Sequence, residues 1–434
     1  MALLPTPLSI GGTTTVRNRL YRAPVLEGAG NGDDGAEVYA KAFVENARHG
    51  VGLIIQGNSC LFEEGRTSPG MTCVDTRERM MRLAPMVEAV HREGAAIWIQ
   101  VGHGGLYAME AWHEPYASRR SGPILAPSPL PWYLRPSFRG VPVHAMTTGE
   151  VYEMAAKYGE VAEWAREAGY DGIQLASSNA KLLDQFLSPF YNRRTDEFGG
   201  SPEGRARILR VIRDEIGRRA GWDYTCTVKI PVGEKAPPFT PKTSWDEGVR
   251  MAEWAQEWGY DAVTPVHVSV LPDTTLSRGG IPRSIWNNKA IAGKLAAASP
   301  RRGRRAVIKA GYLLGGLASP FRPVWNRSRF AAVKERVSIP VFAVGGIRSR
   351  EEAEGILAAG DADMIGIGRP FYAEPDLAAR FVGTTTHSST NGAEVRCRSS
   401  NLCVPAQMLG MRGVCYNPEV TRAVARERRG SPPS

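Results

Sequence analysis

The sequence predicts a (β/α)₈ barrel with a long insertion after its sixth strand and a C-terminal extension. The 434-residue length, a repeated helix–glycine–strand unit and eight short apolar runs support this fold. That length suits one large α/β domain or two ordinary ones. We expect residues 1–380 to form the barrel and residues 381–434 to form an extension with a cysteine segment and a basic tail.

The repeated unit is clearest where "AEWAREAGYDGIQL" (Ala162 to Leu175) is compared with "AEWAQEWGYDAVTP" (Ala252 to Pro265). In each copy a helix ends, a glycine follows and an apolar strand begins. Apolar and small residues between Val151 and Ala165 recur at helical spacing. Gly169 suits the left-handed residue that often ends a helix. The pattern therefore predicts helices that alternate with buried parallel strands.

Eight apolar runs follow such helices or open the chain. An open doubly wound sheet is the alternative to a closed barrel. "AVIKAG" (residues 306–311) could be a ninth strand, but we assign it to the insertion, about residues 271–329. The predicted strands are "LYRAP", "GLIIQ", "AIWIQV", "GIQLA", "TVKIP", "DAVTPV", "PVFAVG" and "DMIGIG".

Composition excludes several classes of function. The net charge is +10, but much of the excess lies in "PRRGRR" (residues 300–305), read as a solvated loop, and in the arginine-rich tail, read as a solvated terminus. Because zinc-finger spacing and interleaved aromatic and basic residues are missing, we expect no nucleic-acid partner. No long apolar run predicts a membrane span, and Pro5 and Pro7 interrupt the N-terminus, so we expect a cytoplasmic protein. Six cysteines in this length predict no disulfide framework.

The carboxyl ends of the last two predicted strands suit a phosphate group. Gly345 and Gly346 follow strand seven, and Gly368 and Arg369 follow strand eight. Bare backbone N–H groups can approach a phosphate closely, and a guanidinium can form a charge-assisted pair with it. Barrels of this type commonly bind phosphate at this position. The alternative is that the glycines only permit tight turns.

Polar side chains end three other strands. Gln100 ends strand three, Lys229 ends strand five and His267 ends strand six. A carboxamide can both donate to and accept from the pyrimidine edge of a flavin, and a cation beside that ring stabilises negative charge formed on reduction. The alternatives are a buried structural Gln, a Lys that reaches solvent and a structural His. As a functional group, His267 would be a donor or acid at the barrel mouth.

With these residues at its strand ends, the chain resembles the Old Yellow Enzyme family of FMN-dependent oxidoreductases. The resemblance spans about residues 8–377 and rests on "RNRLYRAP", "IQVGHGG", "LLDQFLSPFYNRRTDEFGGSPEGRAR", "PVFAVGGI" and "ADMIGIGRPFYAEPDL". It implies an FMN-binding barrel that exchanges hydride with NADH or NADPH and an unsaturated carbonyl compound, and assembly into homodimers. The implied FMN contacts are Pro24, Gly57, Gln100, Lys229, Gly345, Gly346, Gly368 and Arg369.

The chain departs from this family where the substrate carbonyl would bind. By alignment, the two usual carbonyl donors and the proton donor fall at Ala176, Asn179 and Lys181. Asn179 can donate a hydrogen bond, Lys181 could act as an acid if its pKa is lowered, and Ala176 can do neither. Leu26 replaces a frequent Thr or Cys, and Gln174 replaces a usual Glu. A dehydrogenase or desaturase, and a redox-inactive flavin-binding protein, are therefore the alternatives to an ene-reductase.

The tail is similar to an iron–sulfur segment of relatives of 2,4-dienoyl-CoA reductase. That segment places four cysteines, whereas Ser400 here stands where the second would be, leaving Cys397, Cys403 and Cys415. A [4Fe–4S] cluster normally takes four thiolates, so we expect a degenerate remnant and assign no metal residues. A zinc site is supported only by the count of cysteines.

Overall fold

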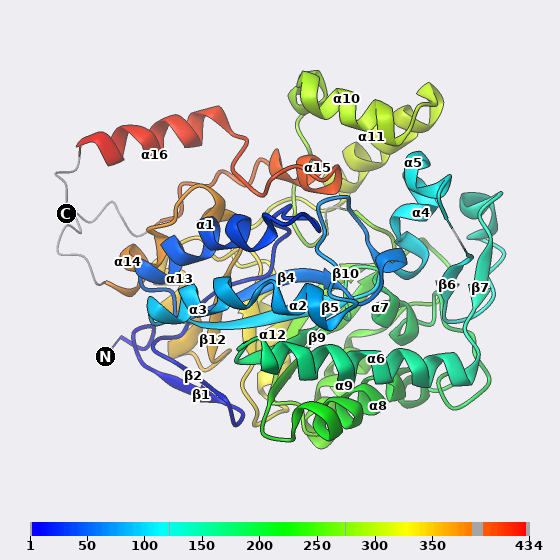
Figure 1. Ribbon diagram of the computed structural model, residues 1–434, viewed down its shortest axis with the longest axis horizontal. Coiled ribbons are helices and arrows are strands. Elements are labelled where there is room, and N and C mark those ends of the chain that lie inside the picture. Colours follow the sequence, from blue (N-terminus) through cyan, green and yellow to red (C-terminus); the bar gives the residue numbers. More distant parts are fainter. Residues whose placement is uncertain (1, 121, 274, 384–393, 431–434) are drawn as a thin grey trace.

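Eight parallel strands form a barrel at the centre of the computed structural model, which describes residues 2–120, 122–273, 275–383 and 394–430 (Figure 1). Their order in the sheet is β10-β9-β8-β5-β4-β3-β12-β11. A parallel bridge between Val263 and Val341 joins β10 to the residue that precedes β11 and closes the barrel. The strands are β3 (Leu20–Arg22), β4 (Leu53–Cys60), β5 (Ala96–Gly102), β8 (Gly172–Leu175), β9 (Thr225–Lys235), β10 (Ala262–Ser269), β11 (Phe342–Val344) and β12 (Met364–Ile367). All eight predicted strands and the barrel class are confirmed.

Helices surround this barrel and bury one face against it. The longer outer helices are α1 (Gly35–Arg48), α3 (Ala84–Arg92), α6 (Thr148–Glu167), α8 (Pro202–Ala220), α9 (Trp245–Glu257), α12 (Arg327–Lys334) and α13 (Arg350–Ala358). Shorter segments are η1 (Glu63–Gly65), α2 (Arg77–Met81), η2 (Gly105–Tyr107), α4 (Met109–Trp112), α5 (Glu114–Ala117), β6 (Ile124–Ala126), η3 (Arg135–Phe138), β7 (Val143–Ala145), α7 (Leu182–Leu187) and α14 (Leu377–Val382).

Helix α6 shows why the repeated unit folds as predicted. Thr147 and Glu150 form a capping box at its start, where the Thr147 side chain accepts from the Glu150 N–H and the Glu150 carboxylate accepts from the Thr147 N–H. The predicted inward face, Val151 to Ala165, is buried. Gly169 ends the unit at φ +92°, a left-handed conformation that glycine adopts without a Cβ clash.

A small two-stranded antiparallel sheet covers the amino ends of the barrel strands. It consists of β1 (Leu8–Ile10) and β2 (Thr14–Val16). Ile10 and Val16 pack in a cluster with Trp98 and Phe342, and the Trp98 indole N–H donates to Thr14 Oγ1 over 2.9 Å. This end of the barrel is therefore filled by side chains, which leaves the carboxyl ends as the mouth.

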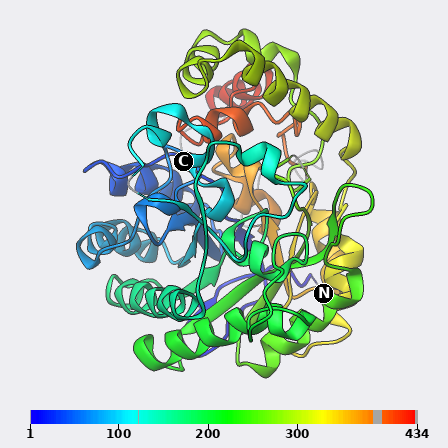
Figure 2. The ribbon, with the colours of Figure 1, turned by 90° about the vertical axis from the view of Figure 1, so that its right-hand side faces the viewer.

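Two segments outside the barrel cover that mouth. The insertion contains η4 (Arg283–Asn287), α10 (Lys289–Ala298) and α11 (Arg302–Ala318), and the extension contains α15 (Cys403–Met408) and α16 (Pro418–Gly430). The short helix η5 (Arg369–Tyr372) directly follows β12. Figures 1 and 2 show α10 and α11 lying beside α15. Buried residues from both segments, including Ile291, Leu295 and Ala406, form one cluster. We call residues 283–318, which contain η4, α10 and α11, the hairpin. The hairpin and the extension together are called the roof.

The structure corrects several expectations about irregular segments. Residues 306–311 lie within α11, in the insertion to which they were assigned and not in a ninth strand. Arg302 to Arg305, expected in a solvated loop, form the start of the same helix. The basic tail forms α16 as far as Gly430. None of the helices in the described ranges combines the length and apolar character needed to cross a bilayer. The boundary expected at residue 381 falls beside residues 384–393, which lie outside the described residues.

Candidate functional site at the barrel mouth

A cavity of about 300 Å³ lies at the carboxyl ends of β3, β11 and β12 and beside Lys229, which lies within β9. We call it the glycine cavity. It is lined by six of the eight predicted cofactor contacts, namely Pro24, Lys229, Gly345, Gly346, Gly368 and Arg369. The two others adjoin it, because a Cβ on Gly57 would lie 2.3 Å from Pro24 Cβ and 3.2 Å from Gln100 Oε1. The barrel therefore brings all eight positions to one place.

Glycine is required at the two positions that follow β11. Gly345 has φ +121° and Gly346 has φ +82°. A Cβ on Gly345 would lie 2.8 Å from Asn326 Cβ, and one on Gly346 would lie 2.7 Å from Trp325 Cδ1. Both the conformation and the close packing of Trp325 exclude a side chain. The bare backbone at this edge of the cavity is what close approach of a phosphate requires.

Gln100 and Lys229 supply the polar groups at the inner end. The Gln100 amide donates to Gln174 Oε1 over 2.8 Å, and the Gln174 amide bonds Thr264 Oγ1 at 3.3 Å. Gln174, which replaces a usual Glu, thus orients Gln100 and leaves the Gln100 Oε1 facing Gly57. Burial lowers the pKa of Lys229 to about 8. Within the described residues Lys229 has no ion pair, so its charge is free to meet a ligand.

Two guanidinium groups stand at the other end of the glycine cavity. Arg369 donates to the Ser277 carbonyl over 2.7 Å and to the Asn401 side chain. Arg348 also lines the cavity and donates to Ser399 Oγ over 3.1 Å. The extension thus holds both cations in place. Arg348 was not predicted as a contact, although it lies only two residues beyond Gly346.

A second cavity of about 480 Å³, here the roof cavity, lies between the barrel mouth and the roof. Asn179 and Lys181 line it, as does Leu26. Asn179 and Ala180 both have left-handed backbones, φ +61° and +57°. The buried Asp184 carboxylate accepts from the Ala180 N–H over 2.6 Å and stabilises this unusual turn. Val404 and Gln407 of the extension line both cavities, which are therefore neighbours.

Lys181 is the buried cation of the roof cavity. Its ammonium donates to Thr67 Oγ1 over 3.0 Å. Burial lowers the pKa of Lys181 to about 8, although the nearby Cys60 opposes this shift slightly. Desolvation therefore brings the pKa of Lys181 closer to neutrality, as a role as a proton donor requires.

The position of the missing donor, Ala176, has a polar neighbour that the sequence analysis overlooked. Ala176 is buried at the end of β8, and a Cβ on Gly102 would lie 2.9 Å from its Cβ and 3.3 Å from Asn58 Oδ1. Both polar atoms of the Asn58 amide are buried and find no hydrogen-bond partner among the described residues. Such groups are normally satisfied, so Asn58 is suited to bond a bound molecule.

His267 does not join the site, so the geometry gives no support to its predicted catalytic role. It lines neither cavity. The Arg278 guanidinium donates to its Nδ1 over 2.8 Å, and Asn326 Oδ1 accepts from its backbone N–H over 3.3 Å. Burial, followed by surrounding cations such as Arg329 and Arg278, lowers the pKa of His267 to about 3. The imidazole is a neutral hydrogen-bond acceptor that holds the insertion.

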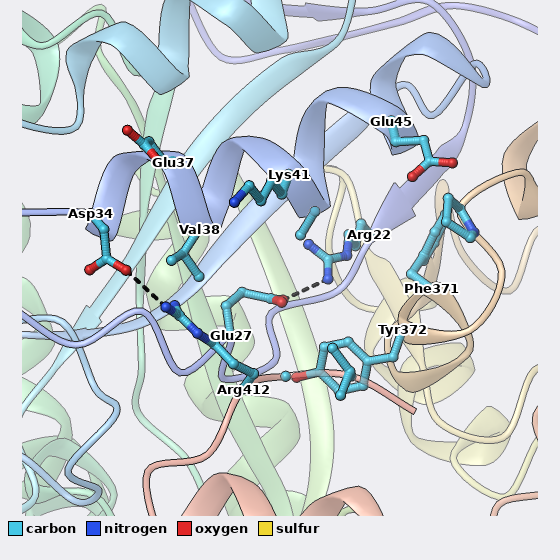
Figure 3. A pocket seen from close by; sticks show the side chains of 14 residues that line it. Arg22, Glu27, Asp34, Glu37, Val38, Lys41, Glu45, Phe371, Tyr372 and Arg412 are labelled. Carbon is cyan, nitrogen blue, oxygen red and sulfur yellow. Dashed lines mark hydrogen bonds and ion pairs between the residues drawn. The ribbon is translucent and has the colours of Figure 1, made fainter. Parts of the chain in front are cut away.

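A third cavity, of about 400 Å³, borders α1 and shares no lining residue with the other two. Figure 3 shows Arg22 and Glu27 meeting in it, 2.6 Å apart, and Arg412 reaching Asp34. Burial raises the pKa of Glu27 to about 7 against the pull of Arg22. The Glu27 carbonyl accepts from the Gly413 N–H over 2.8 Å. These contacts attach the extension to the loop that carries Leu26. Helix α1 begins at Gly35, at the end of this loop.

The three tail cysteines converge as well. Cys397, Cys403 and Cys415 line one small cavity together with Ser400, and all are free. Burial raises the pKa of Cys403 to about 11 and also raises the pKa of Cys415. Three thiols and one hydroxyl therefore stand together, whereas a [4Fe–4S] cluster normally takes four thiolates.

Comparison with known proteins shows the family to which this chain belongs. The model of the NADH:flavin oxidoreductase / NADH oxidase family matches residues 4–282 and 308–385. The chain belongs to this family. NADH oxidase from Thermoanaerobacter brockii is 30% identical over 368 residues, 84% of this chain and 48% of that protein. NADPH dehydrogenase from Bacillus subtilis is 27% identical over 376 residues, covering 86% of this chain and 92% of the relative.

Solved structures agree on the fold of the NADH:flavin oxidoreductase family. The Old Yellow Enzyme homologue from Zymomonas mobilis superposes with a TM-score of 0.62 at 19% identity, covering 96% of this chain and 98% of that one. The chain spans about half the length, 48–52%, of three of the curated relatives that it matches. Residues 283–307, most of the hairpin, fall between the two matched stretches.

The glycine cavity fits the FMN that this family name implies. Its donor set combines backbone that tolerates no Cβ, a carboxamide, an unpaired ammonium and two guanidinium groups. FMN is an anion with a polar pyrimidine edge, so each group has a partner on it. The sequence located eight of these positions. Arg348 and Asn58 were not predicted, and Gln174 was noted only as a departure from the family.

We predict that Arg369→Ala weakens FMN binding about 10- to 100-fold, because a charge-assisted hydrogen bond contributes about 1.5–3 kcal/mol. The dissociation constant is measured by titrating apoprotein into FMN and following flavin fluorescence. Arg398→Ala is the matched control, since Arg398 lies in the same extension but is exposed and pairs with Glu419. An unchanged constant in Arg369→Ala would contradict the assignment of the phosphate end.

Proposed function

We propose that this chain is an FMN-dependent oxidoreductase that takes hydride from NADH or NADPH and delivers it to an unsaturated carbonyl compound. The observation that carries the proposal is the contact between the two cavities. Six of the eight predicted cofactor contacts line the glycine cavity and the two others adjoin it, and the roof cavity beside it holds Asn179 and Lys181. A redox cofactor and a small-molecule substrate could thus meet at one wall.

The residues around the glycine cavity would bind FMN in two parts. The N–H groups near Gly345, Gly346 and Gly368, with Arg348 and Arg369, would hold the phosphate. Gln100, Gly57 and Lys229 would meet the flavin ring, where Lys229 offsets negative charge. When bound, FMN accepts hydride from a nicotinamide and passes it to a second substrate. Lys229 for the more frequent Arg keeps the charge but loses the planar fork.

In the roof cavity, Asn179 and Lys181 would orient the substrate. The Asn179 amide would donate to the carbonyl oxygen, which draws electron density from the adjacent C=C bond. Asn58, whose amide has no partner among the described residues, would offset part of the loss at Ala176. Losing one such donor typically costs about 3–4 kcal/mol of transition-state stabilisation. The clamp is therefore different from the usual pair and not simply weaker.

Lys181 would supply the proton that completes the reduction. Its ammonium lies in the roof cavity, and its contact with Thr67 fixes its position. A lysine whose pKa is lowered to about 8 is a far better acid at neutral pH than an exposed lysine. Above that pH the neutral amine could instead accept a proton, as a desaturase requires. The same residue thus supports both directions of the reaction.

We also propose that the cysteine segment no longer binds a [4Fe–4S] cluster and serves as part of the roof. Ser400 stands in place of one thiolate ligand, which leaves Cys397, Cys403 and Cys415. Asn401 of the same segment donates to the Arg278 carbonyl over 2.6 Å and accepts from Arg369. Its remaining role in this proposal is to hold the phosphate-binding arginine.

We expect anaerobic NADH or NADPH to bleach the visible flavin absorbance of the purified protein, and an unsaturated ketone such as 2-cyclohexen-1-one to restore it. Bleaching by a saturated ketone, with no response to NAD(P)H, would favour the desaturase. Absorbance that neither reagent changes would contradict both activities and leave a redox-inactive flavin protein.

We predict that the rate at which 2-cyclohexen-1-one re-oxidises the reduced enzyme falls as pH rises through about 8, roughly tenfold per unit. Below the lowered pKa Lys181 is the ammonium and can donate, whereas above it the side chain is a neutral amine. Rapid mixing across pH 6–10 measures this rate. Lys181→Met should be slow and lack this breakpoint, and Lys242→Met, an exposed lysine outside both cavities, should keep it. A breakpoint that persists in Lys181→Met would assign the proton to another group.

For the cysteine segment, we expect protein purified without oxygen to contain iron and acid-labile sulfide well below one cluster per chain. Both are determined by colorimetric assay, beside the broad visible absorption that clusters produce. Ser400→Cys restores the fourth thiol and is the matched variant in which iron should rise. Stoichiometric iron and sulfide in the unmodified protein would refute the loss of the cluster.

A further inference from the structure

The hairpin is a feature of this chain that its family membership does not explain. Residues 283–307 contain η4, α10 and the start of α11, and the family model leaves them unmatched. The hairpin is nevertheless built into the mouth. Its buried residues, among them Ile291 and Leu295, share a cluster with Ala406 and Leu409 of the extension. An added segment that is packed in this way has a defined position over the site.

The inner side of the hairpin forms a wall of the roof cavity. Trp286, Leu295, Ile308 and Tyr312 line the cavity from this side, and the Trp286 and Tyr312 rings lie 6.3 Å apart. Tyr107 and Trp112 line it from the segment after β5. At about 480 Å³, the cavity falls in the range of sites for drug-sized molecules. Its aromatic surface suits a ligand with flat apolar rings.

The charges at the cavity define the ligand further. Lys181 and Asp273 are the charged residues of its lining, and Asp273 pairs with Lys235 at 3.3 Å. The positive charge of Lys181 is therefore the one without a carboxylate partner within the described residues. A cationic amine could in principle use the aromatic rings, but Lys309 already lies 5.5 Å from the Trp286 ring centre. The electrostatics favour an uncharged or anionic ligand.

We propose that the hairpin is a selectivity element that makes the roof cavity specific for bulky, aryl-substituted or fused-ring unsaturated carbonyl compounds that are uncharged or anionic. This inference rests on the proposed function, because it names the substrate class of the same site. The apolar rings contact the Trp286 and Tyr312 side of the cavity. The carbonyl oxygen lies toward Asn179 and Lys181.

Binding of two uncharged enones of different size tests the proposal. Calorimetric titration of the FMN-loaded protein with chalcone and with 2-cyclohexen-1-one gives dissociation constants without turnover. We expect chalcone to bind at least tenfold more tightly. Trp286→Ala and Ile308→Ala should each weaken chalcone binding about tenfold and change cyclohexenone binding by less than twofold. A cationic analogue, 4-(dimethylamino)methyl-chalcone at pH 7, should bind at least tenfold more weakly than chalcone.

Val307→Ala is the matched control, because Val307 is the neighbour of Ile308 on α11 but is 71% exposed. It should leave both dissociation constants unchanged. Equal binding of the two enones, or equal effects of Ile308→Ala and Val307→Ala on chalcone, would overturn the proposal. If Trp286→Ala fails to fold, Ile308→Ala and Leu295→Ala carry the same comparison.

The outcome is separable from that of the proposed function. Flavin that NAD(P)H does not reduce, in a protein whose chalcone affinity depends on Trp286 and Ile308, would refute the oxidoreductase activity and support the ligand class. Flavin that is reduced by NAD(P)H and re-oxidised equally well by both enones, with no effect of Ile308→Ala, would support the activity and refute the ligand class.

Discussion

The parallel closure of the eight-stranded sheet is the constraint on which the site depends. In a closed parallel barrel every carboxyl end lies at the same mouth, so residues far apart in the chain become neighbours there. Pro24 and Arg369 line one cavity for this reason. The buried Asn326 amide reinforces the closure, since it donates to the Pro265 carbonyl at 2.8 Å and the Val344 carbonyl at 2.9 Å. The glycine cavity thus stands on the seam between β10 and β11.

Electrostatics give the mouth its chemical character. Four cations gather around the two cavities, namely Lys181, Lys229, Arg348 and Arg369. Burial lowers the pKa of both lysines, which is the cost of taking an ammonium out of water without a carboxylate beside it. Such sites gain most from a ligand that brings its own negative charge. A phosphate-bearing cofactor, and a carbonyl oxygen that becomes negative during reaction, both meet this condition.

The roof shows how segments outside the barrel complete the site. The extension contains none of the eight predicted FMN contacts. However, its Asn401 and Ser399 side chains bond Arg369 and Arg348. Its Val404 and Gln407 side chains line both cavities. The hairpin packs on this extension, where Ile291 and Leu295 share one apolar cluster with Ala406 and Leu409. The segment that is similar to an iron–sulfur motif therefore holds the two arginines of the glycine cavity in position. Assembly into homodimers stays a prediction.

The sequence alone determined the strands and the residues at their ends. Short apolar runs flanked by glycine report burial directly, and in a parallel barrel the strand order then fixes where each end lies, so Gly345, Arg369 and Lys229 could be placed together. Side-chain direction was not determined in this way. A register shift between Val266 and Val268 breaks the alternation of β10, and the His267 imidazole accepts a hydrogen bond from Arg278. The insertion and the extension were predicted as segments, but their conformation was likewise decided only by tertiary structure. Their inward faces become apolar surfaces of a cavity through contact with each other, and contacts between segments about 100 residues apart leave no local pattern in the sequence.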